Sequence, residues 1–134
     1  MKYFLVILGI IVLVSCHKNK TKTQSLEQKI EALAQQKFQD KYVIKWNESK
    51  DYAFIQKKRK TNNSPFPTIS FAIYNALTQE LLHEDTVPGA QIKWFTKDII
   101  EVNSLINRPR DIHESKKKPL YRYNVKTQQK SVIK

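Results

Sequence analysis

The residues that could do chemistry in this 134-residue sequence are three histidines, one cysteine and two clusters of lysine and arginine. His17, His83 and His113 lie far apart in the chain, and none is spaced to share a metal ion with another ligand. The sequence also lacks a nucleophile elbow, a phosphate-binding loop and a zinc-protease motif. We therefore expect no metal site, no bound cofactor and no enzymatic activity.

His83 has acidic neighbours, but they do not suggest a catalytic pair. Glu84 follows it on a predicted strand, where successive side chains point to opposite faces. The only two glycines are Gly9 and Gly89, so a glycine-rich cradle for phosphate groups is excluded as well.

The two basic clusters are the best candidates for a binding site. A formal net charge of +12 favours an anionic neighbour, such as lipid headgroups, a cell-wall polymer or an acidic protein. We expect the clusters in two long loops, the first over residues 57–67, at the same end of the domain. The alternative is that these charges only keep the protein soluble. The candidate residues are Lys57, Lys58, Arg59, Lys60, Arg108, Arg110, Lys116, Lys117 and Lys118.

The N-terminal residues predict an export signal. Lys2 precedes an apolar run over residues 3–14, which at about a dozen residues is shorter than the roughly 20 that a membrane-spanning helix needs. The run ends in Leu13-Val14-Ser15-Cys16, and polar residues follow. This box resembles the lipobox of bacterial lipoproteins. The resemblance implies a signal peptide over residues 1–15 and a diacylglyceryl anchor on Cys16; the alternative is a buried apolar segment with a chance cysteine.

A lipid anchor would fix the compartment of the protein. Two acyl chains give stable attachment to a membrane, whereas one chain gives only marginal binding. We therefore expect a place in the cell envelope, with residues 16–24 as a polar, basic tether and no contact with nucleic acid. The residue after the cysteine is His17 rather than the aspartate associated with inner-membrane retention, which favours the outer membrane facing the periplasm.

Residues 25–134 predict a single β-rich domain with an N-terminal helix over residues 25–39. Ser25 and Gln28 stand at the positions of a capping box, and apolar residues then recur on one helical face. We expect this helix to pack on its own domain; the alternative is a helix that binds a partner or a membrane surface. From Lys41 onward, apolar and polar residues alternate, and turn residues separate about eight segments.

Two sequence matches predict that these strands form an internal repeat. Ile-Lys-Trp occupies residues 44–46 and returns 48 residues later at 92–94. Tyr-Asn-x-x-Thr-Gln occupies residues 74–79 and returns 49 residues later at 123–128. Matches at nearly one offset indicate a duplicated structural unit.

The predicted fold is mainly β (α+β), with the helix followed by an antiparallel meander of two duplicated four-stranded units, 41–91 and 92–134. Each unit resembles one blade of a β-propeller, but two blades cannot close a ring, so a barrel-like or sandwich-like body is expected. Trp46 and Trp94 would occupy equivalent core positions. The alternative for the tryptophans is an aromatic platform for a ligand.

These features predict a membrane-anchored, non-enzymatic lipoprotein of the cell envelope. Its basic loops would bind a protein partner or an anionic envelope component. One alternative is an inhibitor or immunity-type lipoprotein that neutralises a hydrolase or toxin with a loop held on a rigid scaffold. Another is an accessory subunit of an envelope complex, docked through the helix or a sheet edge.

Overall fold

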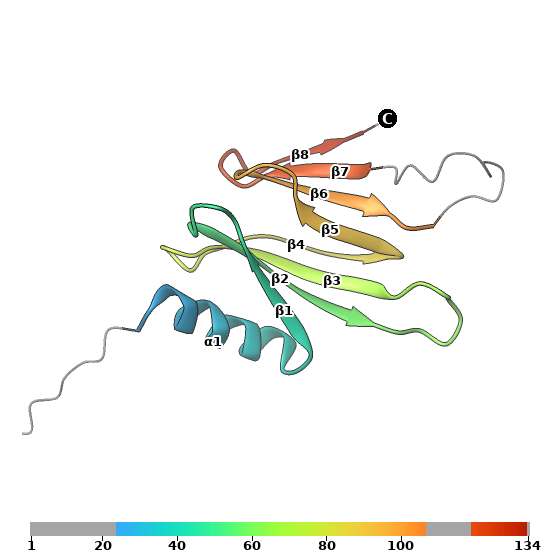
Figure 1. Ribbon diagram of the computed structural model, residues 1–134, viewed down its shortest axis with the longest axis horizontal. Helices are drawn as coiled ribbons and strands as arrows, with labels where there is room; N and C mark the ends of the chain where they lie inside the picture. Colours follow the sequence, from blue (N-terminus) through green and yellow to red (C-terminus); the bar gives the residue numbers. More distant parts are fainter. Residues whose placement is uncertain (1–23, 107–118, 134) are drawn as a thin grey trace, which may run out of the picture.

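The computed structural model describes residues 24–106 and 119–133, which form one helix and eight antiparallel strands (Figure 1). The strands make two four-stranded sheets, and in each sheet every strand pairs with the next along the chain. Sheet 1 contains β1 (Tyr42–Trp46), β2 (Tyr52–Arg59), β3 (Thr68–Asn75) and β4 (Leu81–Pro88). Sheet 2 contains β5 (Ala90–Trp94), β6 (Ile99–Ser104), β7 (Pro119–Asn124) and β8 (Gln129–Val132). The predicted mainly β fold with two four-stranded units is confirmed; the sheets lie face to face and do not close into a barrel.

The helix α1 (Leu26–Phe38) begins at the predicted capping box. The Ser25 hydroxyl accepts a hydrogen bond from the Gln28 backbone N–H, and the Gln28 side chain accepts one from the Ser25 N–H. Ile30, Ala34 and Phe38 recur every four residues and are buried against sheet 1. The apolar face of α1 is thus covered by its own domain. No helix within the described ranges is long and apolar enough to cross a bilayer.

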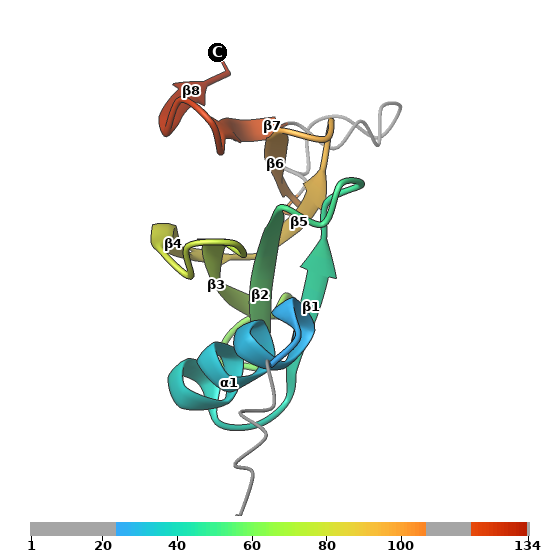
Figure 2. The ribbon, with the colours of Figure 1, turned by 90° about the vertical axis from the view of Figure 1, so that its left-hand side faces the viewer.

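The helix and the two sheets stack as three layers in one direction (Figure 2). In sheet 1, the face that packs on α1 carries Ile44, Trp46, Ala53, Ile55, Ala72, Tyr74 and Ala76. In sheet 2, the equivalent residues pack on sheet 1, and in the same order they are Ile92, Trp94, Ile100, Val102, Tyr121, Tyr123 and Val125. The face of sheet 1 that α1 covers is therefore equivalent to the face of sheet 2 that sheet 1 covers.

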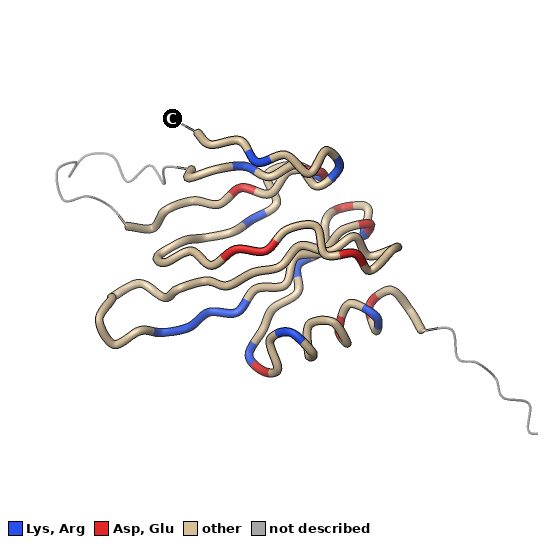
Figure 3. The backbone as a smooth tube through the Cα atoms, turned by 180° about the vertical axis from the view of Figure 1, so that it is seen from behind, with Lys and Arg blue, Asp and Glu red and all other residues tan. Residues whose placement is uncertain are grey.

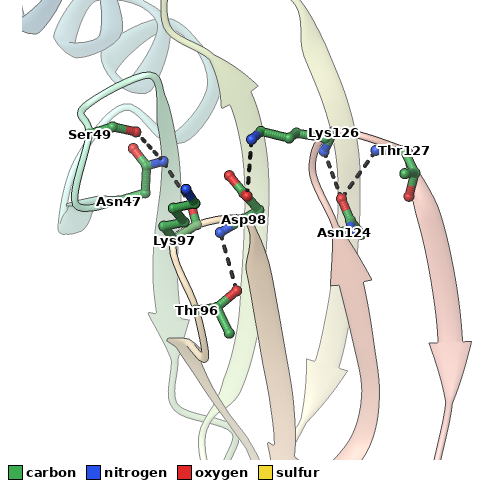
Figure 4. A network of polar contacts seen from close by, with 8 residues as sticks. All are labelled: Asn47, Ser49, Thr96, Lys97, Asp98, Asn124, Lys126 and Thr127. Carbon is green, nitrogen blue, oxygen red and sulfur yellow. Dashed lines mark hydrogen bonds and ion pairs between the residues drawn. The ribbon is translucent and has the colours of Figure 1, made fainter.

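The hairpin between the third and fourth strand of each unit shows the repeat in atomic detail. In both turns the Asn side-chain oxygen accepts hydrogen bonds from the backbone N–H groups two and three residues later, and the Gln has a positive φ. These residues are Asn75 and Gln79 in the first unit and Asn124 and Gln128 in the second. Figure 4 shows the two bonds that Asn124 accepts, from Lys126 and Thr127. The Tyr-Asn-x-x-Thr-Gln match therefore encodes one turn conformation, used twice.

A backbone contact joins this turn to the first hairpin of each unit. The Ala76 N–H donates to the Asp51 carbonyl at 2.8 Å, and the Val125 N–H donates to the Asp98 carbonyl at 2.9 Å. The two units therefore agree in strand order, turn conformation and hydrogen bonding between turns, as the duplication predicts.

The units differ on the face that points away from α1. In sheet 1, one cross-strand row on this face consists of Lys45, Phe54 and Ile73. In sheet 2, the equivalent row consists of Lys93, Glu101 and Arg122. Glu101 is buried, and its carboxylate lies 3.3 Å from the Lys93 ammonium and 2.8 Å from the Arg122 guanidinium. Charged residues replace apolar ones where the stack of layers ends, as in the terminal units of repeat proteins.

Candidate functional site

The first basic cluster is divided between the two faces of β2. Lys57, Lys58 and Arg59 are the last three residues of this strand, and Arg59 still pairs with Thr68 of β3. The loop therefore begins three residues later than predicted, at Lys60, because the backbone ladder continues to that point. Alternation along the strand then directs Lys57 and Lys58 to opposite faces of sheet 1.

Lys57 is used within the protein. Its ammonium donates to the Phe38 carbonyl at 2.8 Å and to the Asp40 carboxylate at 2.9 Å. These bonds hold the end of α1 to sheet 1, and the hydrogen bond and charge of Lys57 keep the pKa of Asp40 below its usual value. Lys57 is therefore a structural residue.

Lys58, Arg59 and Lys60 form an exposed basic stretch at the end of β2 (Figure 3). In the described part of the chain, none of them forms an ion pair, whereas Lys37 and Lys130 each contact a carboxylate of β4. The predicted residues of the second cluster lie outside the described residues, as do His113, Cys16 and the tether up to residue 23; these are Arg108, Arg110, Lys116, Lys117 and Lys118.

The chain segments next to the two clusters meet at Gly89. Its N–H donates to the Pro67 carbonyl at 3.1 Å, and its carbonyl accepts from the Leu105 N–H at 2.7 Å. A Cβ atom at this position would lie 2.6 Å from a side-chain atom of Ile106, and the φ of 55° also favours glycine. Pro67 ends the first connection and Leu105 directly follows β6, so these two chain segments lie side by side at one end of the domain.

A cavity of about 220 Å³ lies between the two sheets beside this basic stretch. Its rim carries two lysines and two amides, its floor is apolar, and none of the described residues that line it carries a carboxylate. The residues around it are Lys45, Gln56, Lys58, Pro67, Ile69, Ala90, Gln91, Ile92 and Leu105. Of the sequence-predicted residues that the structure describes, only Lys58 lines this cavity, where Lys45 and Gln56 join it.

Gln56 is an unusual buried amide. Only 7% of the residue is exposed, yet no hydrogen bond within residues 24–106 and 119–133 involves its side chain. Its amide atoms are not among the fully buried atoms that lack a partner, so solvent in the cavity still reaches them. The Gln56 amide is thus available to a molecule that enters the cavity.

A second polar cluster lies between the sheets at the opposite edge, and its members bond mainly to one another. The Tyr121 hydroxyl donates to the Asp85 carboxylate at 2.7 Å, and the Lys130 ammonium lies 3.6 Å from the same carboxylate. The His83 ring stacks on Tyr123 with ring centres 4.6 Å apart. Burial and the bond to Asp85 raise the pKa of Tyr121. This cluster joins β4 to sheet 2 and is structural.

His83 should make the stability of the protein depend on pH. Burial lowers its pKa in the folded state, although the nearby Asp85 charge opposes this, and its Nε2 is buried without a partner. The unfolded chain therefore binds a proton more readily below about pH 6.5. We expect the free energy of unfolding to fall as the pH drops from 7.5 to 5.0, and to fall less in a His83→Phe variant. Urea unfolding at both pH values measures this, and an equal loss in both proteins would contradict it.

Both tryptophans are partly buried and pack against the two hydrophobic clusters. Trp46 packs in the cluster beneath α1, while the Trp94 indole lies against Phe54, and its N–H donates to the Lys45 carbonyl at 3.1 Å. Beside them, the Asn47 amide donates to the Lys97 carbonyl at 2.9 Å and so links the first turns of the two units (Figure 4). This geometry supports the core prediction over the ligand platform.

Within residues 24–106 and 119–133, no group of three His, Cys, Asp or Glu side chains is placed to hold a metal ion. Comparison with protein-family models, curated proteins and solved structures gives no significant match to this chain. The candidate functional site is therefore the inter-sheet cavity together with the basic stretch Lys58, Arg59 and Lys60.

Proposed function

We propose that this protein is an exported, lipid-anchored binding protein of a bacterial cell envelope, without enzymatic activity. Its β-rich domain binds an anionic envelope component or an acidic protein surface. The lipobox resemblance of Leu13-Val14-Ser15-Cys16 supports the anchor. The observation that carries the binding role is that Lys58, Arg59 and Lys60 are exposed at one end, with no ion pair to any described residue.

The predicted tether would join the domain at the start of α1, whereas the basic stretch at the end of β2 lies beside the other end of this helix (Figure 1). Nine residues, the length of the predicted tether, span at most about 30 Å, which still allows the basic end to reach a membrane surface. Interactions of exposed charges are screened within about 10 Å at 0.1 M salt. Binding to an anionic surface by this end should therefore be strong at low ionic strength and weak at high ionic strength.

A charge reversal at Lys58 tests the proposed function. We expect the protein to bind vesicles rich in phosphatidylglycerol, and Lys58→Glu to weaken that binding at least about fivefold, because it replaces an attraction with a repulsion. Co-sedimentation at 0.05 M and 0.5 M salt measures the effect. Lys97→Glu is the matched control, since it reverses one exposed charge in the β5–β6 turn.

Two results would overturn the proposal. Equal loss in the Lys58 and Lys97 variants would show that net charge, and not the end of β2, controls binding. Salt-resistant, one-to-one binding to a single envelope protein would instead favour the inhibitor or immunity-type function, and a crosslinking pull-down from intact cells would detect that complex.

A further inference from the structure

The rim of the inter-sheet cavity places two positive charges around one opening. Lys45 is on β1 and Lys58 is on β2, and both are on the face of sheet 1 that points toward β5. Both residues are exposed, and neither forms an ion pair with a residue in the described ranges. Because no carboxylate of a described residue lines the cavity, these ammonium groups favour an anion at the opening.

Gln56 places a second chemical requirement on a ligand of the cavity. It lies between the two lysines on the same face of the sheet, and its register partner is Val43 on one side and Phe71 on the other. Its amide, which is reached from the cavity, both donates and accepts hydrogen bonds, and no described residue uses either capacity. A ligand with an amide group of its own would satisfy both.

The floor of the cavity adds a third requirement. Pro67 and Leu105 are partly exposed and supply the apolar surface that a ligand could contact, while the other apolar lining residues, Ile69, Ala90 and Ile92, are at most 2% exposed. An inorganic anion would leave this surface without a partner, whereas a short hydrocarbon group would cover it. At about 220 Å³ the cavity is smaller than a typical drug-sized pocket of roughly 300–1,000 Å³, so the ligand must be small.

We propose that this cavity binds the C-terminal end of an acylated amino acid or short peptide that ends in an apolar residue. The carboxylate lies between Lys45 and Lys58, the last amide group bonds to Gln56, and the apolar side chain covers the floor. This inference rests on the proposed binding function and specifies its ligand. A free acylated amino acid and a peptide end share this chemistry.

Titration with N-acetyl-leucine tests the inference in the lipidated protein, reconstituted in nanodiscs of neutral lipid. Calorimetry should show saturable binding, and the Gln56 side-chain amide signal should shift in nuclear magnetic resonance spectra. N-acetyl-leucine amide, which lacks the charge, and acetate, which lacks the apolar group, should each bind at least about tenfold more weakly. An acetylated tripeptide that ends in leucine distinguishes the two sources of the ligand. Tighter binding of the tripeptide than of N-acetyl-leucine would identify a peptide end. Equal or weaker binding would identify the free acylated amino acid.

Matched variants separate the site from general charge. Lys45→Gln and Lys58→Gln should each weaken binding of N-acetyl-leucine about tenfold, while Lys60→Gln, which removes the same charge outside the cavity, should leave it unchanged. All three lysines are exposed, so thermal unfolding should confirm that the variants remain folded. Equal affinity of all variants, or a Gln56 signal that does not move, would overturn the inference. Vesicle binding that still depends on Lys58 would then leave the proposed function in place.

Discussion

A Cys16→Ala variant should lose all incorporation of a clickable fatty acid in growing cells. The expected modification is a thioether to diacylglycerol, and alanine has no thiol to form it. Two acyl chains hold a protein firmly at a membrane, because each buried CH₂ group contributes about 0.8 kcal/mol. The labelling itself should be all-or-none, because it requires the thiol. In-gel fluorescence of the labelled protein measures the result.

His17→Ala is the control for this experiment, because it changes the adjacent residue and keeps the thiol. It should be labelled as strongly as the wild type. Labelling of the Cys16→Ala protein would show that the lipid is not attached to Cys16, and the lipobox would then no longer support the envelope location proposed for the domain.

The second large effect is expected on the outer face of sheet 2. Glu101 and Arg122 occupy the positions at which sheet 1 has Phe54 and Ile73, and these two residues bury against sheet 2. A Glu101→Phe/Arg122→Ile variant would join two new apolar side chains to Phe95, which is already 46% exposed. We expect this variant to self-associate, because the face would resemble one that is buried when the two units stack.

Light scattering after size-exclusion chromatography measures this association beside the wild type. Glu101→Gln/Arg122→Gln is the matched control, since it removes the same two charges without adding apolar surface. The apolar variant should show a mass that rises with concentration, and the control should not. If both variants behave like the wild type, Glu101 and Arg122 are not what prevents a further layer from packing on the outer face of sheet 2.

Local signals allowed much of the fold to be predicted from the sequence. The capping box of Ser25 and Gln28 and the turn that begins at Asn75 each involve groups only a few residues apart, so their residue types suffice to specify them. The direction of stacking was not predictable in this way. Phe54 and Ile55 are both fully buried, because β2 is covered on both faces, and such a strand shows no alternation.

The candidate site was predictable only in part, because it combines residues from different strands. Lys58 was found from its cluster, but its neighbour Lys57 turned out to hold the end of α1. Lys45 and Gln56 join Lys58 through the pairing of β1 with β2 and the approach of β5, which no local pattern reveals. The charged row of sheet 2 did leave a signal, since Glu101 stands between the buried Ile100 and Val102.

The one-way stacking of the layers gives the domain two different ends. The chain enters through α1, which forms the first layer, and the outer face of sheet 2 forms the last (Figures 1 and 2). A molecule held at Cys16 is therefore attached at the helical end, next to the layer that shields sheet 1. Sheet 2 becomes the distal layer, which molecules approaching from across the compartment would meet first.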